Sequence, residues 1–256
     1  MRTIFVALVS LFAATLFADG PDCPVTYGYS GFAQPSQWEY LSKDTALCGK
    51  GKTQSPVRLA NVHRTKGDVV HFDYHASKMT LRNSGHDFRA LPEGENLVFV
   101  PGVGDAAGYR LDNFHFHTPN EHVVPNVQFD GEIHLVHKRG DQIVVVAIFV
   151  KAGGAENKTL KPVLDKLPLR LCAETPIEFD PNALLATAKG DYYHYTGSLT
   201  TPACTEGVRF YIYPRPIVIS NAQLGKLATY GKNARPLQEN EPPIPIEYVT
   251  TTKKTK

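Results

Sequence analysis

Two short runs of this chain have the residue types and the spacing of a metal site. Phe114-His115-Phe116-His117 alternates aromatic rings with imidazoles, and His134 follows seventeen residues later in a second strand-like run. Successive side chains of a β-strand point to opposite faces, so the first two imidazoles would share one face. Three neutral imidazoles without a cysteine favour Zn²⁺ and leave its fourth tetrahedral position open to water. An open position is typical of a catalytic rather than a structural zinc site.

Polar residues two positions before two of these histidines fit the role of acceptors behind a metal ligand. Asn113 precedes His115, and Glu132 precedes His134, so each pair would share a strand face. Such acceptors fix which imidazole nitrogen carries the proton and raise the basicity of the ligand. Glu121, between the two runs, offers a carboxylate near the metal. The alternative for each histidine is an ordinary hydrogen-bonded residue of the core.

The beginning of the chain has the pattern of a secretory signal peptide. Arg2 precedes an almost wholly apolar run, 4–17, and Ala18 offers a small residue for cleavage before Asp19. The run is shorter than the roughly 20 residues that a membrane-spanning helix needs. We therefore expect residues 1–18 to be removed and the protein to be secreted or periplasmic, without a membrane span.

The cysteines are widely spaced, and export permits them to form disulfides. They are Cys23, Cys48, Cys172 and Cys204. Four cysteines allow three pairings, between which spacing does not choose, and free buried thiols are the alternative for any pair. The formal net charge of +2 argues against nucleic acid or another acidic polymer as a partner.

Short runs rich in β-branched and aromatic residues, separated by proline and glycine, predict a mainly β protein. The run 142–150 is mostly Val and Ile without clean alternation, which favours a central strand buried on both faces. Other strands are expected at 69–72, 79–82, 97–100 and 208–213, the last ending at Pro214, and helices at 159–167 and 221–230. We expect one domain over 19–249 and a solvated basic tail at 250–256.

The motifs taken together resemble those of the α-class carbonic anhydrases of secreted or periplasmic type. The likeness extends from Tyr27-Gly28-Tyr29 to Asn233-Ala234-Arg235-Pro236. Its most specific pieces are Gln54-Ser55-Pro56-Val57, Asn83-Ser84-Gly85-His86, Phe114-His115-Phe116-His117, Glu121-His122, Glu132-Ile133-His134-Leu135-Val136-His137 and Gly197-Ser198-Leu199-Thr200-Thr201-Pro202. The resemblance implies a large twisted, mostly antiparallel central sheet with short peripheral helices. It also implies zinc-dependent, reversible hydration of CO₂ to bicarbonate and a proton, by attack of a zinc-bound hydroxide.

The resemblance assigns roles to the polar residues of the site. The matches to the zinc ligands are His115, His117 and His134. The matches to the acceptors behind the ligands are Asn113, Glu132 and the backbone carbonyl of Asn233. Thr200 matches the hydroxyl that orients the attacking oxygen, and Glu121 matches the carboxylate that holds this hydroxyl. His86 matches the histidine that shuttles the proton, with Tyr29 and Ser84 ordering the connecting waters.

The resemblance also assigns the substrate pocket and one disulfide. The pocket residues are Val136, Val145, Leu199, Thr201 and Phe210. Cys48 and Cys204 match the disulfide that is common in secreted members, which leaves Cys23 and Cys172 as the second pair. Expected partners are CO₂ and bicarbonate, with sulfonamides and anions as inhibitors. The sequence does not give the oligomeric state.

Four positions depart from the family's usual residues. Asn113 stands where Gln is usual and reaches about one methylene less toward His115, and Ala203 stands where a second proline is common. Arg89 places a cation on the pocket side near the expected shuttle. Phe210 takes a wall position where Trp is more frequent. These departures affect the expected rate more than the expected type of reaction.

Two rival functions come from different classes. A carbonic anhydrase-like binding or scaffold protein would have lost catalysis, but the three candidate zinc ligands are all present. A zinc hydrolase is the second rival. The chain has no His-Glu-x-x-His motif, and Glu121 is expected to be engaged with Thr200 rather than free as a general base.

Overall fold

The computed structural model describes residues 25–102 and 107–252. The expected signal peptide, Cys23 and the residues 253–256 of the expected tail lie outside these ranges. The strands are β1 (His63–Gly67), β2 (His71–Asp73), β3 (Ser77–Asn83), β4 (Phe88–Pro92), β5 (Leu97–Phe99), β6 (Tyr109–His117), β7 (Gly131–Arg139), β8 (Gln142–Ala152), β9 (Glu174–Phe179), β10 (Tyr192–Ser198), β11 (Glu206–Ile219) and β12 (Glu247–Thr251). The α-helices are α1 (Leu47–Lys50), α2 (Lys161–Leu164) and α3 (Asn221–Ala228), and 3-10 helices cover Gly31–Ala33, Pro35–Tyr40, Lys43–Thr45 and Pro181–Leu185.

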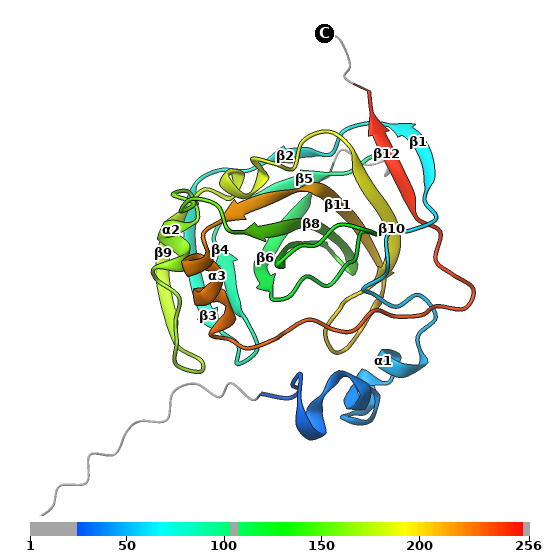
Figure 1. Cartoon of the computed structure of the whole chain (residues 1–256), viewed down its shortest axis with the longest axis horizontal. Coiled ribbons are helices and arrows are strands. Elements are labelled where there is room, and N and C mark those ends of the chain that lie inside the picture. Colours follow the sequence, from blue (N-terminus) through cyan, green and yellow to red (C-terminus); the bar gives the residue numbers. More distant parts are fainter. Residues whose placement is uncertain (1–24, 103–106, 253–256) are drawn as a thin grey trace, which may run out of the picture.

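One large sheet dominates the described part of the chain (Figure 1). Its strand order is β1-β12-β10-β11-β8-β7-β6-β4-β3-β9, with β5 paired to β6 and β2 paired to β5. Two pairs, β1 with β12 and β8 with β11, are parallel, and the other pairs are antiparallel. The short helices lie at the periphery (Figure 1). The expected mainly β, mostly antiparallel fold is confirmed.

The central strands are apolar on both faces because the sheet is covered on both sides. In β8, Val144 and Val146 join one buried cluster, whereas Val145 and Ala147 join another. Consecutive side chains therefore enter different clusters, as the two-residue period of a strand requires. The prediction of a central strand buried on both faces is confirmed for this segment. The second cluster lies on the face that carries the histidines, because Val136, next to His134 on that face of β7, belongs to it.

Some predicted boundaries were wrong. Strand β11 does not end at Pro214 but continues to Ile219, and its register with β8 is irregular between Tyr213 and Ile217. The two prolines in between have no N–H to donate, so the ladder skips them and resumes at Ile217. The helix expected at 159–167 is a single turn, α2. Strand β12 extends to Thr251, two residues into the segment expected to be a tail.

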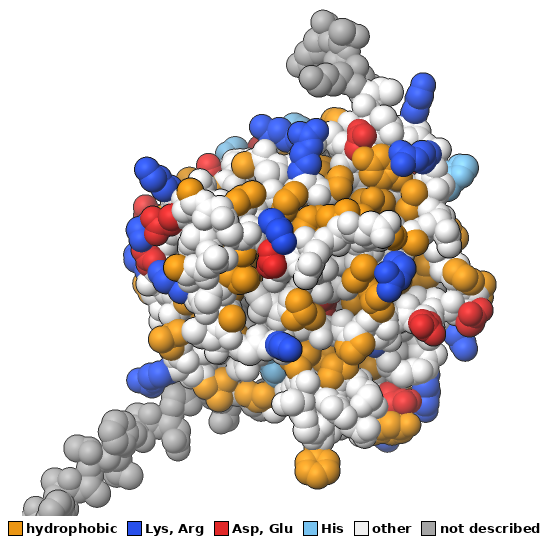
Figure 2. All heavy atoms as spheres, in the orientation of Figure 1, with side chains coloured by type: hydrophobic (Ala, Val, Ile, Leu, Met, Phe, Trp, Pro, Cys, Tyr) orange, Lys and Arg blue, Asp and Glu red, His pale blue; other side chains and the backbone are white. Residues whose placement is uncertain are grey.

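The segment before the sheet packs as a separate small cluster below it (Figure 1). Trp38 is fully buried there with Tyr27, Cys48 and Cys204. The indole N–H donates to the carbonyls of Gly28 and Ala33, so burial leaves it satisfied. Charged side chains of both signs are scattered over the face in Figure 2, with no block of one sign. Within the described residues, no helix has the length and apolar character to span a membrane.

Candidate functional site

The strand register brings the three candidate ligands together. His115 on β6 lies directly opposite His134 on β7, and His117 lies opposite Glu132. The ring centroids of the three histidines are separated by 5.0, 5.6 and 4.6 Å. One nitrogen from each ring lies within 4.8 Å of the others, and all three side chains are buried. Two neighbouring antiparallel strands therefore present three imidazoles to one point.

Each of these histidines uses its other nitrogen to donate to an acceptor. His115 Nδ1 donates to Asn113 Oδ1 at 2.8 Å, and His117 Nδ1 donates to the Asn233 carbonyl at 2.7 Å. His134 Nε2 donates to Glu132 Oε1 at 2.9 Å. Assigned from this network, the unprotonated nitrogens are Nε2, Nε2 and Nδ1 respectively. These lone pairs are the ones that converge, which is the arrangement that a metal ion requires.

Two buried atoms next to this cluster have no hydrogen bond within the described residues. They are His117 Nε2 and Glu121 Oε2, which lie 3.4 Å apart. A buried polar atom without a partner is unfavourable by about 1–3 kcal/mol, so native proteins seldom retain one. A cation bound to the imidazoles would supply the missing partner of His117. The residues present therefore fit a zinc ion with three nitrogen ligands.

A second group with the composition of a metal site shares one of these residues. His122, Glu132 and His134 also place ligand atoms within 4.8 Å of one another. Here the contacts are hydrogen bonds, because Glu132 Oε1 accepts from His122 Nδ1 at 2.7 Å and from His134 Nε2 at 2.9 Å. His122 Nε2 lies 2.6 Å from the hydroxyl of Tyr195. This group supports the ligand His134 from behind rather than forming a second metal site.

Burial and the neighbouring charges set the protonation of the cluster. Burial opposes ionisation of Glu132, yet the imidazoles of His122 and His134 hold its pKa well below the usual range. Burial lowers the pKa of His115 strongly and that of His134 as well, although Glu132 opposes the shift at His134. The side chains are therefore a carboxylate and neutral imidazoles, which are the forms that bind metal ions.

Glu121 and Thr200 lie beside the histidine cluster, and both are buried. Glu121 Oε1 accepts the backbone N–H of Arg235 at 2.8 Å, and its Oε2 faces His117. Burial raises the pKa of Glu121 to about 7, while His134, the nearby Thr200 hydroxyl and the Arg235 N–H lower it. A cation bound at the histidines would lower this pKa further and favour the carboxylate.

The apolar residues expected to form the pocket gather on the same face as the ligands. Val136, Val145 and Phe210 are buried in one cluster, and Leu199 packs against it. The first three follow one line of register across β7, β8 and β11. The Phe210 ring lies edge-on to His134, with centroids 6.0 Å apart. Thr201 is partly exposed in the loop after β10.

Comparison with known proteins identifies the family to which this cluster belongs. A model of the eukaryotic-type carbonic anhydrase family matches residues 33–244. The chain belongs to the α-class carbonic anhydrases. Membership makes it an enzyme of the carbonic anhydrase class, whose reaction is the hydration of CO₂.

Individual relatives of this family match almost the whole chain. The carbonic anhydrase of Neisseria gonorrhoeae is 34% identical over 247 residues, which are 93% of this chain and 95% of the relative. The structure of α-carbonic anhydrase from Thermovibrio ammonificans with the inhibitor sulfanilamide is 32% identical, with a TM-score of 0.79 over 88% of this chain and 98% of that one. Dioscorin complexed with ascorbate is 30% identical, with a TM-score of 0.78 over 89% and 99%.

His86, the candidate proton shuttle of this carbonic anhydrase, is held against the N-terminal segment. It is 7% exposed, and its ring stacks on Tyr27 with centroids 3.9 Å apart. Its Nε2 contacts the backbone carbonyl of Tyr27, and the Tyr29 ring lies edge-on at 6.2 Å. Ser84 makes its hydrogen bonds within its own turn, to Asp87 and His86. As placed, Nε2 is engaged, so a relay would pass through Nδ1 or require the ring to turn.

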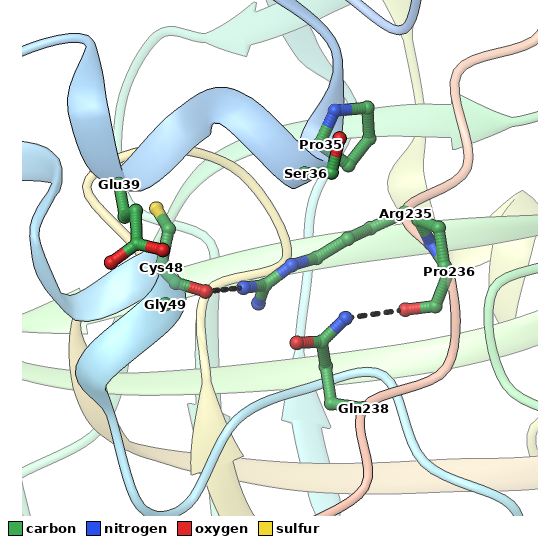
Figure 3. A pocket seen from close by; sticks show the side chains of 8 residues that line it. All are labelled: Pro35, Ser36, Glu39, Cys48, Gly49, Arg235, Pro236 and Gln238. Carbon is green, nitrogen blue, oxygen red and sulfur yellow. Dashed lines mark hydrogen bonds between the residues drawn. The ribbon is translucent and has the colours of Figure 1, made fainter.

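The expected Cys48–Cys204 disulfide is confirmed, and it ties α1 to the loop that carries Thr200. Arg235 strengthens this junction from below. Its guanidinium donates to the carbonyls of Cys48 at 2.8 Å and Ser55 at 2.7 Å and to Gln54 Oε1 at 2.9 Å. Figure 3 shows this side chain among those that line a pocket, extending toward Cys48. The pairing expected for Cys23 falls on a residue outside the described ranges and stays a prediction.

Four residues around the site have no role predicted from the sequence. Ser55 Oγ is 2.8 Å from the Tyr195 hydroxyl and thereby extends the chain behind His134. Tyr27, Asp87 and Arg235 contact His86, Arg89 and Glu121 respectively. Ser55 and Arg235 lie in the family motifs, but their contacts depend on long-range packing. Strand periodicity therefore carried no signal for them.

Proposed function

We propose that this protein hydrates CO₂ reversibly to bicarbonate and a proton at a zinc ion held by His115, His117 and His134. One observation carries the proposal: three buried imidazoles turn their unprotonated nitrogens toward one point, and each is backed by an acceptor. When bound, zinc supplies a Lewis acid that lowers the pKa of water to about 7, a value for which carbonic anhydrase is itself the standard example. Family membership supports the reaction.

Glu121 and Thr200 orient the attacking oxygen in this proposal. An ionised carboxylate can only accept hydrogen bonds, so Glu121 draws the Thr200 hydroxyl proton toward itself. The lone pairs of Thr200 then face the histidine cluster and accept from the group that attacks. Glu121 is itself held by the backbone N–H of Arg235. The pair therefore aims the nucleophile without taking its proton.

The apolar wall receives the substrate in this proposal. CO₂ is small and uncharged, so Val136, Val145, Leu199 and Phe210 offer it a site from which ordered water is easily displaced. Thr201, in the loop beside this wall, is assigned to hold bicarbonate.

The product proton leaves by way of His86, with Tyr29 and Ser84 beside the path, in this proposal. Imidazole suits such a relay because its ordinary pKa of about 6.5 lies near that of the acid it serves. We also propose that the protein is exported, because a disulfide persists in an oxidising compartment. Sulfonamide and anion inhibition is expected, as the sulfanilamide complex of a relative supports.

The first experiment measures zinc content and stopped-flow CO₂ hydration of the purified protein, before chelation, after chelation and after zinc is restored. We expect one zinc per chain, hydration that disappears with the metal and returns with it, and inhibition by sulfanilamide. His134→Gln should lose most of its zinc, because it removes one of the three proposed nitrogen ligands. The exposed His63 on β1 provides the control, since His63→Gln leaves both quantities unchanged.

A binding protein without catalytic activity would give a different result in this experiment. A folded protein that retains one zinc but hydrates CO₂ no faster than buffer would overturn the proposed reaction while leaving the metal site intact. A folded protein that binds no zinc would overturn both.

A further inference from the structure

A positively charged side chain lies beside the candidate ligands, on the same face of the sheet as His115. Arg89 on β4 pairs in register with His115 on β6. Residues directly opposite each other on antiparallel strands project to the same face, with Cβ atoms about 4.5–5.5 Å apart. Arg89 is thus the next side chain along the line that runs through His115 and His134.

The Nε–H of Arg89 lacks a well-aligned hydrogen-bond acceptor within the described residues. Its Nε is fully buried and has no hydrogen bond, and the nearest carboxylate oxygen, Asp87 Oδ1, lies 3.5 Å from it. The side chain as a whole is 36% exposed. Because Nε is buried, other atoms of the side chain provide this exposed surface. A guanidinium offers five N–H donors. Of these, Nε–H has no well-aligned acceptor within the described residues, and Asp87 and the Tyr27 hydroxyl lie close to the guanidinium.

Asp87 holds this arginine in place through an ion pair at Nε. The carboxylate is 3% exposed, and its Oδ1 already accepts the hydroxyl of Ser84. The ion pair is therefore confined to one end of the guanidinium. Burial opposes the charge of Arg89, but Asp87 and the phenols of Tyr27 and Tyr29 keep its pKa above the usual value. The group stays cationic throughout the working pH range of an enzyme.

Arg89 places this charge one strand away from His115, on the same face of the sheet. A cation at this place distinguishes the two carbon species of the proposed reaction. Carbon dioxide is uncharged and gains little from it, whereas bicarbonate is a planar oxyanion that matches the fork of a guanidinium.

We propose that Arg89 is an anion-binding residue, which holds bicarbonate and other small oxyanions beside the three histidines. The identity of the principal anion rests on the proposed function, whereas the presence of the site does not. Arg89 then sets how strongly product and inhibitory anions are retained, and Asp87 positions it for that task.

The test compares three single variants of the zinc-loaded enzyme. Arg89→Gln removes the charge, and Arg89→Lys keeps the charge without the planar fork. Arg82→Gln is the matched control, because Arg82 lies opposite Arg89 on β3, one strand farther from the histidines, and pairs with Glu174. The quantities measured are kcat/KM for CO₂ and the inhibition constant of bicarbonate during hydration.

In Arg89→Gln, we expect the bicarbonate inhibition constant to rise about 10-fold, which equals about 1.4 kcal/mol. Its kcat/KM for CO₂ should change less than about 2-fold, because this variant loses an interaction with the bound product and not with the uncharged substrate. Arg89→Lys should recover part of the affinity, and Arg82→Gln should match the parent. An unchanged inhibition constant in Arg89→Gln, or an equal rise in Arg82→Gln, would overturn the proposal.

A second readout does not depend on turnover. Bicarbonate that binds the folded state raises the midpoint of thermal unfolding, and at a fixed concentration the rise grows with the logarithm of its affinity. We expect this rise to be smaller in Arg89→Gln than in the parent and unchanged in Arg82→Gln. A parent enzyme that is inactive toward CO₂, yet shows an Arg89-dependent rise, would contradict the proposed function and support the anion site. An active parent whose rise is the same in Arg89→Gln would contradict the anion site alone.

Discussion

At the scale of single residues, the protonation of each imidazole depends on one neighbouring acceptor. Asn113 illustrates this, because its side chain is shorter than the Gln usual in the family, yet its Oδ1 lies 2.8 Å from His115. The register of β6 shifts between Leu111 and Asn113, and Asp112 accepts from the Asn113 amide at 2.9 Å. The irregular backbone and the anchored amide together compensate for the missing methylene.

His86 is proposed to shuttle the product proton, yet it is buried and stacked on Tyr27. Its role is therefore tested by substitution. His86→Ala should lower maximal turnover in weak buffer. Without a relay, a zinc-bound water of pKa about 7 would lose its proton to bulk water at no more than roughly 10³ per second. Added imidazole should restore part of the loss. The measurement is stopped-flow CO₂ hydration at increasing imidazole concentration.

His75→Ala is the control for this experiment, because His75 is exposed and its Nε2 lies 3.2 Å from Asp73 Oδ1. It should leave both turnover and the response to imidazole unchanged. Undiminished turnover in His86→Ala, or a loss that imidazole does not repair, would remove His86 from the mechanism.

At the level of whole elements, the loop that carries Thr200 is held by contacts from distant parts of the chain. Cys204 follows the Thr200 loop and is joined to Cys48 in α1, 156 residues earlier. Arg235 links the same junction to Glu121 through its backbone N–H. Neither attachment belongs to the sheet, so the loop is positioned by the N-terminal cluster and the segment before β12 as much as by β10.

Replacing both cysteines, Cys48→Ala with Cys204→Ala, should destabilise the protein by about 3–5 kcal/mol in the chain-entropy account of a long closed loop. Zinc content should persist, because the ligands lie on β6 and β7. Urea unfolding of the parent and the double variant measures the difference. The reduced parent is a second comparison, and equal stability of all three forms would show that the bridge does not stabilise the fold.

At the scale of the whole molecule, the two faces of the sheet contain different chemistry. One face holds the cluster of three histidines, and the opposite face is a large apolar core. His137 on β7 is an exception on that opposite side, where it is fully buried and contacts the hydroxyl of Tyr74 and the carbonyl of Val144. A titratable group buried in an apolar core makes global stability depend on pH.

Burial lowers the pKa of His137 to about 3, against an ordinary value of 6.5. Between these values the unfolded chain binds a proton that the folded chain does not. The free energy of unfolding should therefore fall as pH decreases from 6.5 toward 3, by up to about 1.4 kcal/mol per pH unit from this group. Urea unfolding at several pH values measures the slope, which should be smaller in His137→Gln.

The other buried histidines contribute equally to parent and variant, so the difference in slope isolates His137. His63→Gln, at an exposed position, should keep the slope of the parent. If His137→Gln and the parent lose stability at the same rate over this range, the buried imidazole is not responsible.

Local patterns in the sequence were enough to predict the class of fold and the candidate ligands. Alternation in Phe114-His115-Phe116-His117 is local, and so is the two-residue offset between each ligand and its acceptor. Strand order, register and long-range contacts are tertiary properties, and they decided the rest. They set Arg89 beside His115, pressed His86 against Tyr27 and carried β11 past its prolines. The physical reason is that periodicity states which way a side chain points, while only packing states what it meets.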